Sequence, residues 1–168
     1  MKQFYIQLTR PNKGFKALSW LIRKILRTDY SHVIVRWFGA KDKVEIVWEA
    51  AGSSIRFLGP IAHDKKYVVI KEYAVDITPT EYSKLIEYTH KYAHVDYGKL
   101  QLIGMLIARI FKMKKNILSK GEAEQVCSEA VAGLLKFVKG WDIDINMDVY
   151  GPDALDKWLE KKTKEKSA

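Results

Sequence analysis

The chain has 168 residues, of which 48% are hydrophobic and 29% are charged. This length suits one domain with one core, and the composition excludes a disordered or low-complexity protein. The longest apolar stretch, residues 100–111, contains Gln101, Gly104 and Arg109 and is too short to cross a bilayer, so we expect no integral membrane protein. The first ten residues lack the charged region, apolar region and small-residue cleavage site that follow one another in a signal peptide. Cys127 has no second cysteine to pair with. Both features favour a reducing, cytoplasmic compartment.

Positive charge is concentrated in two segments of the chain. The 29 lysines and arginines against 20 aspartates and glutamates give a net charge of +9. Residues 1–30 contain seven of these cations and one acid, and residues 109–120 contain five and no acid. Such segments are either solvated surface or contacts for a polyanion such as anionic lipid. They contain no nucleic-acid motif, so we expect no nucleic-acid partner.

The first elements in chain order are a short strand and a basic helix. Residues 4–8 predict a strand, which the turn residues 11–14 end. The apolar residues that follow recur at helical spacing: Phe15, Leu18, Leu21, Ile22, Ile25 and Leu26. The opposite side of this helix is basic and includes Trp20. Either its apolar side packs in the core and its basic side faces solvent, or the helix lies on a membrane surface.

The middle of the chain reads as a sheet and the remainder as helices. Residues 31–37, 43–49, 54–58 and 66–73 predict strands, and the short turns at 39–42 and 51–53 favour antiparallel pairing. Thr78 is expected to cap a helix beginning at Pro79, with Glu81 completing a capping box. Three more helices are expected, at residues 97–112, about 125–138 and 152–162, before a solvated tail from about residue 160. This order predicts an α+β fold in a single domain over residues 1–168, with helices packed on an antiparallel sheet.

Cys127 is the candidate nucleophile. It begins a predicted helix, where unpaired backbone N–H groups and the helix dipole stabilise a thiolate. Glu122 and Glu124 would oppose a thiolate if their side chains approached the sulfur. The alternative is a cysteine packed in the core, because an apolar helical stripe starts at this residue. That stripe continues with Ala130, Val131 and Leu134.

A nucleophilic thiol needs a base, and the chain has four histidines. His63 lies among charged residues and is expected on the surface. His90 and His94 have a spacing that could bind a metal on a helix, but no third ligand motif accompanies them, so we expect a solvated pair and no metal. His32 begins a predicted strand. Glu49 ends the next one, where it could orient the imidazole or instead pair with a surface lysine.

Five short segments follow one another in an order that resembles a known family. They are Ser31-His32-Val33, Val47-Trp48-Glu49-Ala50, Asp96-Tyr97-Gly98, Val126-Cys127-Ser128-Glu129-Ala130-Val131 and Tyr150-Gly151-Pro152-Asp153-Ala154-Leu155. Together they resemble the circularly permuted branch of the NlpC-type papain-like cysteine peptidases, the YiiX and YaeF group. The resemblance covers residues 29 to about 159 and matches the family's cysteine to Cys127, its histidine to His32 and its third polar residue to Glu49.

The resemblance implies a papain-like fold and a chemistry that needs no cofactor. In this mechanism His32 takes the proton of Cys127, the thiolate attacks an amide, peptide or isopeptide carbonyl, and Glu49 orients the imidazole. The backbone N–H of Cys127 is the expected oxyanion donor. Tyr30 and Tyr97 either line the substrate site or are ordinary packed aromatics.

Departures from the family leave the substrate class open. Members that cut cell-wall peptides are usually exported, whereas this chain has no evident export signal or wall-binding module. Its basic segments would suit a site beside an anionic membrane, as in the related lecithin:retinol acyltransferase-like proteins, so the protein could also lie at the periphery of a membrane. Three classes therefore remain: a cysteine hydrolase, a thiol acyltransferase or lipid amide or ester hydrolase at a membrane, and a binding module with an inert Cys127.

Overall fold

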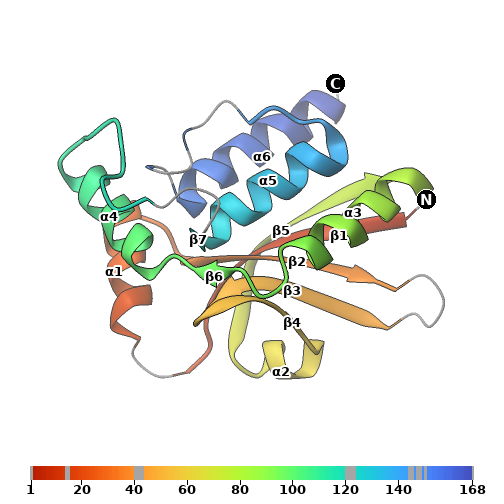
Figure 1. Ribbon diagram of the computed structural model, residues 1–168, viewed down its shortest axis with the longest axis horizontal. Helices are drawn as coiled ribbons and strands as arrows, with labels where there is room; N and C mark the ends of the chain where they lie inside the picture. The colour runs from red at the N-terminus through yellow and green to blue at the C-terminus, as the bar shows by residue number, and fades with distance from the viewer. Residues whose placement is uncertain are drawn as a thin grey trace.

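The computed structural model describes residues 2–13, 16–39, 44–119, 124–143, 146, 149 and 151–167. A seven-stranded mixed sheet, in the order β5-β1-β2-β3-β4-β6-β7, forms the centre of an α+β fold (Figure 1). Its strands are β1 (Lys2–Pro11), β2 (His32–Phe38), β3 (Glu45–Ala51), β4 (Ser54–Leu58), β5 (Tyr67–Ile77), β6 (Asp96–Tyr97) and β7 (Glu124–Gln125). The helices are α1 (Ala17–Leu26), α2 (Pro60–Asp64), α3 (Pro79–Lys91), α4 (Lys99–Ile110), α5 (Cys127–Lys139) and α6 (Pro152–Ser167). No helix among these residues has the length and hydropathy needed to span a bilayer.

The five strands predicted between residues 4 and 73 are confirmed, and they pair antiparallel as expected. β1 is twice as long as its predicted core because it pairs with β2 on one side and with β5 on the other. β5 continues to Ile77 because every second residue, Tyr73, Val75 and Ile77, is buried in the core. Residues 40–43 of the predicted 39–42 turn and of the predicted third strand lie outside the described residues.

The prediction of a purely antiparallel sheet is wrong at one edge. β6 pairs antiparallel with β4 at a single position, and β6 pairs parallel with β7 through Asp96–Glu124 and Tyr97–Gln125. Two-residue strands have no readable period, so the sequence pattern could not reveal them. This short parallel pair joins the segment before α4 to the segment before α5.

The predicted helices are confirmed, with different ends. Thr78 Oγ1 accepts a hydrogen bond from the backbone N–H of Glu81 at 3.2 Å, and the Glu81 carboxylate accepts one from the N–H of Thr78 at 2.8 Å, so the capping box is confirmed. α4 begins two residues later than expected because Tyr97 belongs to β6, and α6 extends five residues further, through the predicted tail. Phe15, expected in the first helix, lies outside the described residues, as does Tyr150 of the last family-like segment.

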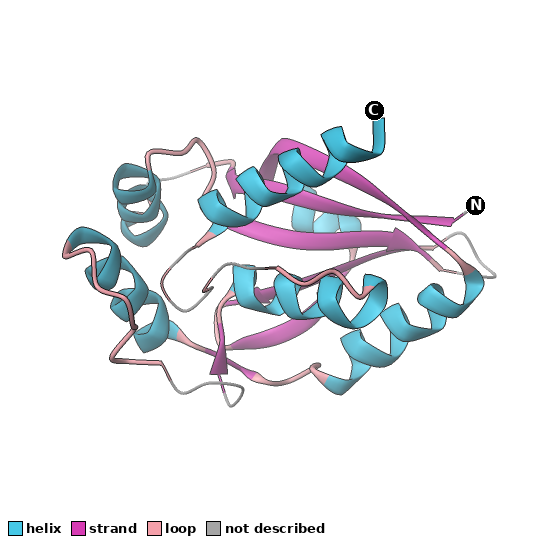
Figure 2. Cartoon of the chain, turned by 90° about the horizontal axis from the view of Figure 1, so that it is seen from above, coloured by secondary structure: helices cyan, strands magenta, loops and turns pink. Residues whose placement is uncertain are grey.

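Helices cover the sheet unevenly. α3, α5 and α6 lie over one face, and the short α2, which the sequence pattern did not indicate, lies on the other (Figures 1 and 2). The main core forms where α5 packs on β2 and β3, with Trp48, Leu134 and Leu135 fully buried. A second apolar cluster joins α1 to α4 and reaches the start of α5; it contains Ile22, Leu26, Leu102, Met105, Leu106 and Val126. Both clusters therefore fix the first turn of α5.

Candidate active site

Cys127 is the first residue of α5, as the sequence predicts. Its N-cap is Val126, whose backbone N–H donates to the Glu129 carboxylate at 3.0 Å. The Gln101 amide, from α4, donates to the same carboxylate at 2.6 Å, so two helices hold this turn in place. Because the first N–H groups of a helix have no intrahelical acceptor, those of Cys127 and the residues after it point out of the helix end. Cys127 is only 4% exposed, so this residue both packs against the core and lies at the helix start.

His32 is the first residue of β2 and is almost fully buried. Its Nε2 lies 3.0 Å from a carboxylate oxygen of Glu49. Cys127 is the second group that interacts with this ring and favours its charged form. Burial opposes protonation of this histidine, but the interactions with Cys127 and Glu49 outweigh it and raise its pKa to about 9. The imidazolium is therefore the stable form of His32 at neutral pH.

Glu49 is a fully buried carboxylate with two cationic neighbours. In the β3–β4 register it stands directly opposite Arg56, whose Nε and Nη2 donate to it at 3.0 and 2.7 Å. Burial would raise its pKa, but His32 and Arg56 together lower that pKa to about 2. The sequence left open whether this glutamate orients His32 or pairs with a surface lysine. In the structure it contacts His32, and the second cation is an arginine that only the strand register could have indicated.

Behind His32 is an aromatic stack that sequence reasoning missed. The Tyr67 ring lies 5.5 Å from that of His32 and 4.9 Å from that of His63, measured between ring centroids. The prediction that His63 is on the surface is wrong: the residue is completely buried, because α2 packs on β3 and turns it inward. Asp64 accepts from His63 Nδ1 at 3.2 Å and is itself held by Arg36. Burial lowers the pKa of His63, so this ring is neutral at pH 7.

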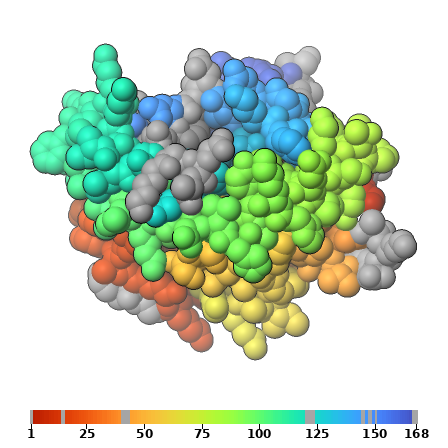
Figure 3. Space-filling model, in the orientation of Figure 1, coloured from red at the N-terminus to blue at the C-terminus, as the bar shows by residue number. Residues whose placement is uncertain are grey.

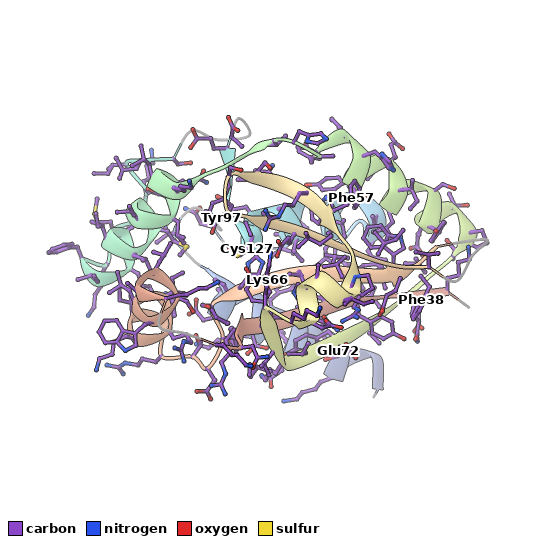
Figure 4. All side chains as sticks on the ribbon, turned by 90° about the horizontal axis from the view of Figure 1, so that it is seen from below. Phe38, Phe57, Lys66, Glu72, Tyr97 and Cys127 are labelled. Carbon is purple, nitrogen blue, oxygen red and sulfur yellow. The ribbon has the colours of Figure 1, made fainter. Side chains whose placement is uncertain are left out.

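Tyr97 joins the site and Tyr30 does not. Tyr97 lines a cavity of about 620 Å³ together with His32 and Tyr67, and Figure 4 shows it beside Cys127. Burial and the nearby Cys127 sulfur raise the pKa of Tyr97, which keeps its hydroxyl protonated. Tyr30 lies elsewhere: its hydroxyl donates to Asp156 at 2.6 Å, beside a separate cavity of about 790 Å³.

The remaining histidines lie away from this site. His90 is in α3 and its ring packs 5.3 Å from that of Phe57. The expectation that His90 and His94 share a helix is wrong, because α3 ends at Lys91 and His94 has a left-handed backbone with φ of 74°. Both side chains are exposed. Over the part of the chain that the structure describes, no group of three or more potential metal ligands occurs.

The structure therefore brings together Cys127, His32 and Glu49, which the sequence selected, with Tyr97 at the cavity wall. Glu124 lies in β7, and Glu122 lies outside the described residues. No family model matches the chain, and no curated protein matches it in sequence.

Proposed function

We propose that this protein is a cysteine hydrolase with a papain-like fold that cleaves an amide, peptide or isopeptide bond. One observation carries the proposal: a buried imidazole held between a thiol at a helix start and a buried, ionised carboxylate. A charged histidine and a charged glutamate are costly to bury unless they are paired. A site that keeps both beside a sulfur is well arranged to stabilise a thiolate.

In the proposed mechanism the proton of Cys127 is already on His32 in the resting site, as an imidazolium beside a thiolate, and the thiolate attacks the substrate carbonyl. A carbon–sulfur bond forms as the carbonyl π electrons move onto its oxygen. His32 then gives the proton to the leaving amine, the carbon–nitrogen bond breaks, and a thioester remains on Cys127. Glu49 keeps the imidazole oriented and offsets its charge, while Arg56 keeps Glu49 ionised.

Two donors are available for the oxyanion that forms on the carbonyl oxygen. The first is the backbone N–H of Cys127, which points out of the first turn of α5. The second is the hydroxyl of Tyr97, which remains protonated beside the sulfur because burial raises its pKa. Water then attacks the thioester while His32 removes its proton, and the acid product and the free thiol are released.

The test is the alkylation of Cys127 by iodoacetamide, which requires no knowledge of the substrate. The rate constant is measured by mass spectrometry at pH 7 for the wild type and for His32→Ala. His90→Ala is the matched control, because it removes an exposed histidine of α3 that lies away from the site. We expect His32→Ala to slow alkylation at least about tenfold, because the imidazolium that favours the thiolate is gone. The control should react at the wild-type rate.

Each result of this test decides between the hydrolase and a binding module. A fast, His32-dependent reaction supports the hydrolase and justifies screening fluorogenic amides, peptides and esters. A native Cys127 that reacts only after unfolding, or a rate that His32→Ala leaves unchanged, refutes the hydrolase and favours a non-catalytic binding module on the same fold.

A further inference from the structure

Helix α4 has two apolar faces. One face packs against α1, where Leu102 and Leu106 are buried beside Leu26. The other face is aliphatic and points outward, with exposed fractions of 54% for Leu100, 44% for Ile103, 56% for Ile110 and, at the C-cap, 72% for Phe111. The outer face of an ordinary surface helix is polar. This outward stripe is therefore available for a partner that accepts apolar side chains.

Helix α1 adds further exposed apolar residues beside α4. It packs against α4 at one end of the molecule, and Figures 1 and 3 show α4 above α1 at the left of the view. Leu18, Trp20 and Leu21 of α1 are exposed. We call the exposed residues of α1 and α4, with Phe111, the α1–α4 surface. It combines aliphatic side chains with two exposed aromatics, the residue types that insert at the boundary between lipid headgroups and acyl chains.

The charge that the two segments around α1 and α4 contribute is of one sign, although Arg109 is paired with Asp153 of α6. Residues 10–28 and 99–119 contain no aspartate or glutamate. The exposed cations of these segments include Lys16, Lys24, Arg27, Lys99, Lys112, Lys114 and Lys115. Lys24 Nζ lies 5.9 Å from the centroid of the Trp20 ring, so cations and apolar side chains are interleaved. Nucleic acid would use the charge but not the aliphatic stripe, and a neutral protein partner would use the stripe but not the charge; an anionic bilayer uses both.

The α1–α4 surface also flanks the candidate active site. Leu18 and Ile22 of α1, with Lys99 and Leu102 of α4, line the same cavity as His32 and Tyr97. A membrane bound to this surface would therefore meet the mouth of that cavity. Apolar walls from both helices suit a substrate that carries an acyl chain.

We propose that the α1–α4 surface docks on an anionic phospholipid bilayer and holds the cavity of His32 and Tyr97 at the membrane. The substrate is then an amide or ester of a membrane-held acyl chain, a part of the inference that rests on the proposed hydrolase. Binding does not rest on it, so the two are tested separately.

Binding is measured by sedimentation with phosphatidylcholine vesicles that contain or lack phosphatidylglycerol. The protein carries Cys127→Ser, so the result is independent of catalysis. We expect binding to the anionic vesicles only, and loss of binding as salt is raised. K112Q/K115Q should weaken it about 30-fold, because each cation near an anionic surface contributes about 1 kcal/mol. K161Q/K164Q, with two exposed lysines on α6, should not.

A matched pair of variants tests the apolar contribution. Ile110→Ser removes an exposed isoleucine of the α1–α4 surface, and Ile61→Ser removes an exposed isoleucine of α2, on a different part of the molecule. We expect only Ile110→Ser to weaken vesicle binding, by about fivefold or more, because one buried aliphatic side chain contributes at least about 1 kcal/mol.

Three results would overturn the docking proposal: equal binding to neutral and anionic vesicles, equal weakening by Ile61→Ser, or a dimer in light scattering that Ile110→Ser converts to a monomer. The last would make the surface an interface between two copies. The substrate part is tested with active protein and an N-acyl amide held in the same vesicles. Vesicle binding together with a Cys127 that is indifferent to His32 would leave docking intact and refute the hydrolase.

Discussion

Replacing Glu49 by glutamine removes the only carboxylate that contacts His32 among the described residues. In the native protein the pKa of His32 is about 9 instead of the ordinary 6.5, so about 99% of this side chain is protonated at pH 7. An opposite charge at this distance raises a pKa by about 1 to 3 units. We therefore expect Glu49→Gln to lower the titration midpoint of His32 by that amount. Between about 90% and about 10% of the ring is then protonated at pH 7, and Cys127 alkylation slows in proportion, by up to about tenfold.

The assay is a pH titration of the histidine ring resonances by NMR, with the His32 signal assigned from His32→Ala. Glu45→Gln is the matched control: it removes a carboxylate from the same strand that pairs with Arg36 and not with the site. Urea unfolding checks that Glu49→Gln is folded, since breaking a buried ion pair costs about 3 to 5 kcal/mol. A His32 midpoint that stays near 9 in Glu49→Gln, or that falls equally in Glu45→Gln, would refute our account of how the imidazole is charged.

Three further predictions concern stability. The pKa of Glu49 is about 2 in the folded protein against an ordinary 4.5, so its ionised form adds about 3 kcal/mol to the unfolding free energy above pH 4.5, and this is lost as the pH falls toward 2. Between these pH values the melting temperature of the wild type should therefore fall more steeply with pH than that of Glu49→Gln. Gly133→Ala should cost about 1 to 3 kcal/mol in urea unfolding, because its Cβ would lie 2.2 Å from the Tyr88 hydroxyl, whereas Gly59→Ala has no atom within 4 Å and should cost less. Asp156→Asn should lower the unfolding free energy by about 2 to 4 kcal/mol without changing the alkylation rate of Cys127, and a changed rate would place that cluster within the site.

Features set by local patterns could be predicted from the sequence. The strands from β1 to β5 follow from β-branched and aromatic runs between turn residues, and the capping box at Thr78 follows from three residue types at fixed spacing. The contact between His32 and Glu49 follows from two consecutive strands that pair antiparallel, because this pairing places the start of β2 beside the end of β3. The position of Cys127 at a helix start depended on a helical stripe that begins at that residue.

Features set by tertiary contacts could not be predicted from the sequence. Tyr30 comes two residues before His32, and strand alternation alone would put both side chains on the same side. Tyr30 lies outside β2, however, and its hydroxyl donates to Asp156 of α6, a contact between residues far apart in the sequence. His63 is carried inward by a five-residue helix, which is too short to show a period in the sequence. Its burial depends on Tyr67 and on the face of β3 that α2 covers, and neither is encoded near His63 in the chain.

The parallel pairing of β6 with β7, two residues each, closes a long loop of the chain. Asp96 and Tyr97 precede this loop, and Glu124 and Gln125 follow it. The segment between them, which includes α4, is therefore held at both ends by the strand pair. This strand pair lies next to Cys127, and it sets the separation between Tyr97 and the first turn of α5. Changes in the length or composition of the loop leave that separation in place. The segment that we propose to dock on a membrane is therefore separated, by this pair of strands, from the residues that we propose to carry the chemistry.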